Sequence, residues 1–202
     1  MMLTNKKTIE EYAQKYDSWY ENTADEATES KIKTWFKTHR YLDKKRFIEI
    51  GCWKSPRIRG HCENNNSATV KEITKFSFAT TNEETMIVVL CALNGVQYPV
   101  ASAILHFAFP DKYPILDFRA IWSLGWEQPE HYNFRFWQKY CSKIRDISKE
   151  TGESIRTVDK ALWEYSKEHQ TKELLDEAAE RFAQIAVAHI DEKYKKEKSG
   201  RQ

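Results

Sequence analysis

Residues that interrupt helices are scarce in this chain, which has only 6 Gly and 5 Pro among 202 residues. Apolar residues recur instead at the three- and four-residue spacing of amphipathic helices, and Ala, Leu, Ile, Lys and Glu are abundant. Together, the scarcity and the spacing predict an all-α protein. A chain of this length buries a sizeable core and forms one domain or two small lobes.

Long hydrophobic runs are also missing. No apolar stretch reaches the roughly 20 residues that a membrane-spanning helix requires. The N-terminal residues MMLTNKKTIEEYAQ contain no hydrophobic stretch of the kind found in signal peptides. We therefore expect a cytoplasmic protein that makes no membrane contact.

Cysteine is sparse and irregularly spaced. The residues Cys52, Cys62, Cys91 and Cys141 include no C-x-x-C pair, which argues against a secreted disulfide framework and against the usual zinc and iron–sulfur signatures. Cys52, His61 and Cys62 are close in sequence, but no fourth ligand stands at a usual spacing. We expect incidental thiols, no bound metal and no cofactor.

Neither sign of charge dominates the whole chain, whose net charge is +2, but the charge is unevenly spread. The segment from Lys31 to Lys75 has twelve Lys or Arg against four Asp or Glu, which leaves the remainder at −6. A basic region on a nearly neutral protein is typical of a polyanion partner, because neutralised phosphates release counterions. Solvated helix faces are the alternative explanation of such a run.

Helical periodicity extends through most of the sequence. We expect helices around residues 9–20, 32–36, 47–50, 70–76 and 86–93, and then over residues 99–109, 117–124, 132–147, 157–165 and 172–194. The segment 53–69, WKSPRIRGHCENNNSAT, is rich in Asn, Gly, Pro and Ser, and predicts a loop.

The most distinctive segment runs from Leu93 to Gly125. It contains the turn LNGVQ, the small-residue helix PVASAIL and, after a bend between two prolines, the sequence PILDFRAIWSLG. A glycine-containing turn between two helices presents backbone N–H groups and a positive helix end toward an anion such as a phosphate. An ordinary corner between two core helices would have similar features.

This order of parts resembles the active-site segment of helix-hairpin-helix DNA glycosylases, hydrolases of base excision repair that remove damaged or mispaired bases. LNGVQ is similar to the family's L-P-G-V-G hairpin, PVASAIL is similar to the T-A-x-x-I-L helix that follows it, and Asp117 falls at the position of the catalytic aspartate. The resemblance, to a branch without an iron–sulfur cluster, implies a two-lobed helical fold and double-stranded DNA as the partner. The hairpin residues that would contact a phosphate are Gly95, Val96, Gln97 and Tyr98.

Two departures from the family pattern affect the expected activity. Gln97 replaces the second glycine of the hairpin, and a side chain is costly at a left-handed backbone position, so we expect a reshaped turn. The lysine with which bifunctional members form a Schiff base is absent, and Pro99 stands at the matching position. The resemblance therefore implies a monofunctional enzyme that leaves an abasic site. A lyase step by Lys54, approaching from another helix, is the alternative.

Asp117 is the candidate catalytic residue. An enzyme that acts on a base in duplex DNA flips that base into a pocket. Breaking the bond to the sugar builds positive charge, which a nearby carboxylate stabilises while it orients the attacking water. At a helix N-terminus, Asp117 is kept ionised by the helix dipole and also caps the helix. Capping alone would explain an aspartate at this position.

The segment EIGCWKSPRIR, before the hairpin, is expected to supply the base pocket, because the family takes pocket residues from a helix in this place. Trp53 would stack on the flipped base, and Lys54 would lie beside it. Lys54, Arg57 and Arg59 would bind flanking phosphates. A core position is the alternative for Trp53.

Two other functions stay open at this point. A helix-hairpin-helix protein that binds DNA without catalysis is consistent with Gln97. The segment 147–162, ISKETGESIRTVDKAL, also resembles the helix-turn-helix of transcription regulators, with Gly152 at the turn and Ser154 as a cap. In such a regulator, Arg156 and Thr157 would read the DNA sequence.

The expected fold has two helical lobes. Residues 44–130 would form the lobe with the hairpin and Asp117, and residues 1–43 would pack with residues 131–202 as the second lobe. DNA would lie across the cleft between the lobes of a monomer, with Asp117 at the floor of the cleft. Pocket residues vary within this fold, so the sequence does not identify the excised base.

Overall fold

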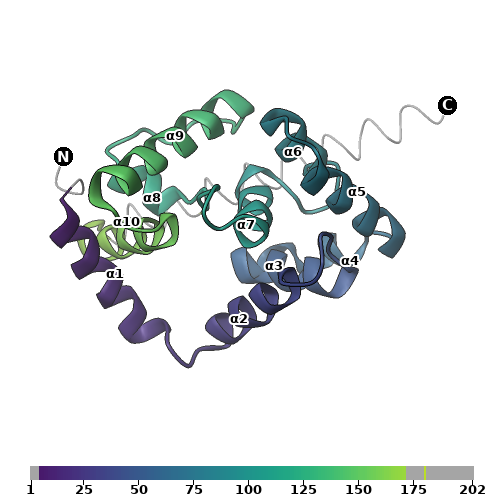
Figure 1. Cartoon of the computed structure of the whole chain (residues 1–202), viewed down its shortest axis with the longest axis horizontal. Helices are drawn as coiled ribbons and strands as arrows, with labels where there is room; N and C mark the ends of the chain where they lie inside the picture. Colours follow the sequence, from purple (N-terminus) through teal and green to yellow (C-terminus); the bar gives the residue numbers. More distant parts are fainter. Residues whose placement is uncertain (1–4, 172–179, 181–202) are drawn as a thin grey trace.

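The computed structural model of the chain describes residues 5–171 and Glu180, and every regular element in this part is a helix (Figure 1). The prediction of an all-α fold is confirmed. Apart from Glu180, the helix predicted over residues 172–194 lies outside the described residues. Within the described part, no helix is both long enough and apolar enough to cross a membrane.

The helices follow one another with short connections. Their bounds are α1 (Lys6–Tyr20), α2 (Ala24–Phe36), α3 (Lys44–Lys54), the 3-10 helix η1 (Pro56–Ile58), α4 (Arg59–Glu63), α5 (Ser67–Ala79), α6 (Glu83–Leu90), α7 (Tyr98–Ala108), α8 (Phe118–Ser123), α9 (Phe134–Thr151) and α10 (Ile155–His169). The predicted loop over residues 53–69 was mostly wrong, because η1 and α4 form in its middle and its two ends belong to α3 and α5. Ile58 and Cys62 are four residues apart and both buried, and this apolar pair is hidden among polar neighbours in the sequence.

Polar side chains begin most of these helices. Each accepts a hydrogen bond from a backbone N–H of the first turn, and the capping residues are Asn5, Thr23, Asp43, Asn66, Asn82, Asp117, Asn133 and Ser154. Among the described helices of eight or more residues, α7 differs, because its N-cap residue Gln97 makes no side-chain cap. The first-turn N–H groups of α7 are therefore left to other partners.

The helices lie in two groups (Figure 1), and these groups share one continuous buried core. In one group, α10 packs against α1, α8 and α9. In the other, α3 packs against α2, α4, α5 and α7, and α6 packs against α5 and α7. The division into lobes at residues 44 and 130 stays a prediction. Helix α2, placed in the second lobe, packs against α3 and α7 of the first, and α8, placed in the first lobe, packs against α10 of the second.

Candidate functional site

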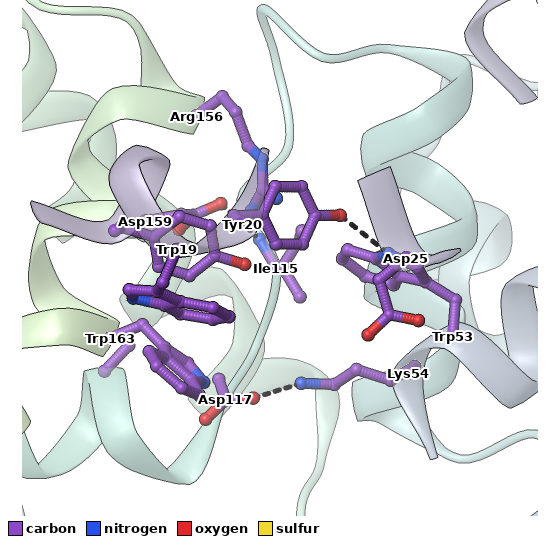
Figure 2. Close-up of a pocket in the computed structure, with 12 residues that line it drawn as sticks. Trp19, Tyr20, Asp25, Trp53, Lys54, Ile115, Asp117, Arg156, Asp159 and Trp163 are labelled. Atoms are coloured by element: carbon purple, nitrogen blue, oxygen red, sulfur yellow. Dashed lines mark hydrogen bonds and ion pairs between the residues drawn. The ribbon is translucent and has the colours of Figure 1, made fainter. Parts of the chain in front are cut away.

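A cavity of about 220 Å³ lies where α1, α3, α8 and α10 converge (Figure 2). Its lining residues come from both groups of helices and are Tyr16, Trp19, Tyr20, Asp25, Trp53, Lys54, Ile115, Asp117, Ala120, Arg156, Asp159 and Trp163. Pockets for drug-sized ligands measure roughly 300–1,000 Å³. This cavity is smaller, and its size suits a single heterocycle.

Aromatic rings form much of the cavity wall. The ring centroids of Trp19 and Trp163 are 5.2 Å apart, and Tyr16 lies 4.7 Å from Trp19 and 5.4 Å from Trp163. Figure 2 shows Trp19 and Trp163 on one side of the cavity and Trp53 on the other. Flat aromatic faces of this kind stack on planar heterocycles, a contact that tolerates any base.

At the floor of the cavity, Lys54 forms an ion pair with Asp117 (Figure 2). Lys54 is the last residue of α3, and its Nζ donates to Oδ2 of Asp117. The other carboxylate oxygen of Asp117 accepts the backbone N–H of Arg119 at 2.9 Å, which makes Asp117 the cap of α8. The exposed fractions of the two side chains are 5% for Lys54 and 18% for Asp117.

This pairing keeps Asp117 charged. Burial by itself raises the pKa of the carboxyl group. The Lys54 ammonium and the Arg119 N–H together lower the pKa by more than burial raises it, so the pKa lies below its ordinary value. Asp117 is therefore ionised at neutral pH. A carboxylate held ionised beside an aromatic cavity is placed to stabilise positive charge on a bound molecule.

The link before Asp117 is anchored on α7. His106 Nδ1 donates a hydrogen bond to the carbonyl oxygen of Tyr113 at 2.8 Å, and Ser102 Oγ accepts the N–H of Leu116 at 2.8 Å. Burial lowers the pKa of His106 to about 3, so its imidazole stays neutral and its Nδ1 carries the proton. Both α7 side chains are fully enclosed, and they fix the residues that lead into Asp117.

The same link is anchored on α9 and α10 through Ile115. Tyr140 Oη donates to the carbonyl oxygen of Ile115 at 3.0 Å, and the N–H of Ile115 donates to Asp159 Oδ2 at 2.9 Å. Asp117 thus stands two residues after a backbone position that is held on both sides. These bonds hold the backbone before Asp117 in one position, as a preorganised site requires.

A buried ionic network supports the aromatic wall. Glu29 Oε2 accepts from Arg156 and from Tyr20 Oη, both at 2.8 Å, and the indole N–H of Trp53 donates to Tyr20 Oη at 3.0 Å. Burial raises the pKa of Glu29, but Arg156 and Lys33 outweigh this effect and bring it to about 2. Glu29 of α2 therefore fixes the orientation of Trp53 through the hydroxyl group of Tyr20.

The turn before α7 closes around Gly95, whose φ is +83°. Asn65 holds the preceding residue in both directions: its Nδ2 donates to the carbonyl oxygen of Asn94 at 3.0 Å, and its Oδ1 accepts the N–H of Asn94 at 2.8 Å. A Cβ atom on Gly95 would meet Cys62 Sγ at 3.1 Å. Both the backbone conformation and the close approach therefore require glycine here.

Gln97 does not have the left-handed backbone conformation that its position in the hairpin motif predicts. Its φ is −120° and its ψ 173°, which is extended backbone that any residue adopts, so the expected strain at Gln97 was wrong. The left-handed position of the turn is Gly95 alone. The side chain of Val96 is buried, whereas Gln97 and Tyr98 are partly exposed beside the uncapped start of α7.

The remaining predicted residues lie outside the cavity. Arg57 and Arg59 are exposed, and Arg59 pairs with Glu63 at 3.5 Å. In the proposed helix-turn-helix, Gly152 ends α9 with φ +74° and Ser154 caps α10, as expected. Arg156, however, faces the cavity and Glu29 instead of the surface.

Several cavity residues were not foreseen from the sequence. Arg156, Asp159 and Trp163 lie on one face of α10, at the three- and four-residue spacing of adjacent helical turns. Two charged residues on a helix face that also buries Val158 and Leu162 are the signal that would have revealed them.

Potential metal ligands do not gather in the described part of the chain: no group of three or more His, Cys, Asp or Glu side chains there could hold a metal ion. Cys62 is buried against Gly51 and Gly95 instead. Comparisons of the chain with protein-family models, with curated protein sequences and with solved structures gave no match.

Proposed function

We propose that this protein is a DNA glycosylase that hydrolyses the N-glycosidic bond of a damaged or modified base. One observation carries the proposal: an ionised carboxylate, Asp117, lies at the floor of an aromatic cavity of the size of one heterocycle. A flipped base would stack between the Trp19–Trp163 wall and Trp53, and its sugar would lie near Asp117.

In the proposed reaction, the bond between C1′ of the sugar and the base nitrogen breaks, and its electron pair leaves with the base. Asp117 stabilises the positive charge that develops on the sugar. A water molecule then bonds to C1′ and gives its proton to the carboxylate. The product is an abasic site in an intact strand, as expected of a monofunctional enzyme.

The hairpin supports duplex DNA as the substrate. Helix α7 begins without a side-chain cap, and the residues at its start, Gln97 and Tyr98, are partly exposed. Such a helix end binds a phosphate. The exposed residues Arg57 and Arg59 would add contacts to the backbone.

A second candidate activity rests on the position of Lys54. Its amine lies against Asp117 in the cavity, although the hairpin itself has no lysine. For this reaction Lys54 would first pass a proton to Asp117, and its amine would then bond to C1′ as the bond between C1′ and the base breaks. Opening of the sugar ring would give a Schiff base, and elimination of the 3′ phosphate would cleave the strand, as in a bifunctional glycosylase. A sequence-specific regulator is disfavoured, because Arg156 of its recognition helix is committed to the cavity.

The deciding experiment is single-turnover cleavage of duplex oligonucleotides that carry a panel of damaged bases. We expect alkali-dependent nicking at one lesion or lesion class by the wild type, and its loss in Asp117→Asn, which retains a good helix cap. Asp25→Asn is the matched control, because it removes a carboxylate from the exposed rim of the same cavity.

Each outcome separates the candidates. Nicking without alkali, together with trapping of the protein on DNA by borohydride, would identify Lys54 chemistry. Failure to release any base, with DNA affinity unchanged by Asp117→Asn, would leave a protein that binds DNA without catalysis.

A further inference from the structure

Asp159 is a second buried carboxylate of the cavity, and the proposed reaction does not use it. It lies on α10, is 5% exposed and lines the cavity. Its Oδ2 accepts the N–H of Ile115 at 2.9 Å. Its Oδ1 is buried and has no hydrogen-bond partner among the described residues.

An unpaired buried acceptor is costly unless a ligand supplies the missing donor. Burial raises the pKa of Asp159 to about 7, against the opposing influence of the Ile115 N–H and of Arg156. An acceptor that the fold leaves incomplete, in a cavity with aromatic walls, is complementary to a flat molecule that carries an N–H group.

A second unpaired atom lies one helical turn away. Arg156 Nε is buried and has no partner within residues 5–171, although the guanidinium bonds to Glu29 at its other end. Arg156 and Asp159 are three residues apart on α10 and both line the cavity. The pair therefore offers one acceptor and one donor, which matches a ligand edge with an N–H beside an acceptor atom.

We propose that Asp159 reads an N–H donor on the hydrogen-bonding edge of the bound nucleobase, with Arg156 Nε donating to the neighbouring acceptor. The cavity then accepts bases with an open donor–acceptor edge, such as adenine, hypoxanthine or uracil. It rejects bases whose edge is blocked, such as 1,N6-ethenoadenine. The proposal rests on the proposed function only in taking a nucleobase as the ligand.

Free N-methylated bases test this recognition without any excision. The probes are 9-methyladenine and 9-methylpurine, which differ by the amino group, and binding is followed through the tryptophan indole signals in ¹H–¹⁵N NMR spectra. We expect 9-methyladenine to bind about tenfold more tightly than 9-methylpurine, because an uncompensated buried acceptor is left with the second. In Asp159→Asn, which presents an amide N–H to the cavity, this preference disappears, whereas Asp146→Asn, at an exposed position of α9 outside the cavity, retains it.

The result is read separately from catalysis. Equal affinity of the wild type for the two probes, or an unchanged preference in Asp159→Asn, overturns the role of Asp159. Excision by the wild type that includes 1,N6-ethenoadenine overturns it as well, while leaving the glycosylase intact. If the protein prefers 9-methyladenine through Asp159 but excises no base, the recognition site is supported and the proposed glycosylase activity is overturned.

Discussion

Lys54 and Asp117 are 63 residues apart in sequence and form an ion pair inside the cavity. Each charge also complements the helix end on which it stands. Lys54 ends α3, where the dipole is negative, and Asp117 caps α8, where it is positive. The pair therefore joins a helix of each group at the site where chemistry is proposed, and it sets the charge state of Asp117.

Replacing Lys54 by Met is expected to shift the pH dependence of base excision. Burial is the largest influence on Asp117 and raises its pKa, and without Lys54 this influence meets less opposition. The acid limb of the kcat/KM profile should therefore move to higher pH in Lys54→Met. Base release should persist above that limb if water is the nucleophile, and should vanish if Lys54 is. Lys45→Met, at an exposed position of the same helix, should leave the profile unchanged.

Arg57 is expected to contribute to DNA binding through a phosphate. Its side chain is exposed next to the end of α3. In Arg57→Ala, the slope of log affinity against log salt concentration should fall by about 1 unit for any duplex sequence. Arg135→Ala, at an exposed position of α9 outside the basic segment, is the control. Equal effects of the two changes would mean that the basic segment is not the footprint of DNA.

The local features of this site could be predicted from the sequence, but the long-range contacts that assemble the site could not. Helical spacing predicted α7 and α8, and the position of Asp117 as a cap is a local property of the chain. The contact of Arg156 with Glu29 spans 127 residues, so no local pattern reveals it. Gln97 was misjudged because a motif position was taken for a backbone conformation, whereas the structure needs only Gly95 at positive φ.

Three glycines allow the constraint at the turn to be measured. Gly95→Ala should lower the free energy of unfolding the most, by about 2 kcal/mol or more, because its φ is positive and its Cβ would crowd Cys62 and His61. Gly152→Ala, with positive φ but open space, should cost about 1 kcal/mol. Gly60→Ala, in α4 with open space, should be neutral or stabilising. Urea denaturation of the three variants gives this order, and equal losses at Gly95 and Gly152 would exclude crowding as a cause.

Glu29→Gln is expected to destabilise the protein by about 3 kcal/mol at neutral pH, because it leaves the buried Arg156 without its charge partner. The folded-state pKa of Glu29 is about 2, below its ordinary value of 4.5. Its contribution is thus present above pH 4.5 and is lost as the pH falls toward 2. The gap between wild type and variant in urea denaturation should narrow over this range. Glu72→Gln, at an exposed position of α5, should have little effect at any pH.

Asp159→Asn is expected to have the opposite effect on stability, because the pKa of this carboxyl group is raised from 3.8 to about 7. A group with a raised folded-state pKa stabilises fully below its unfolded value, and the stability is lost as the pH rises through the folded value. The variant and the wild type should therefore be similarly stable near pH 4, and the variant should exceed the wild type by about 4 kcal/mol at pH 8. The other titrating groups are common to both proteins and cancel in the difference. If the free energies of unfolding of the wild type and the variant change in parallel between pH 4 and pH 8, the pKa of Asp159 is not raised in the folded protein. A widening gap, together with weaker binding of 9-methyladenine, would show that this carboxylate lowers the stability of the fold while it completes the recognition of a base.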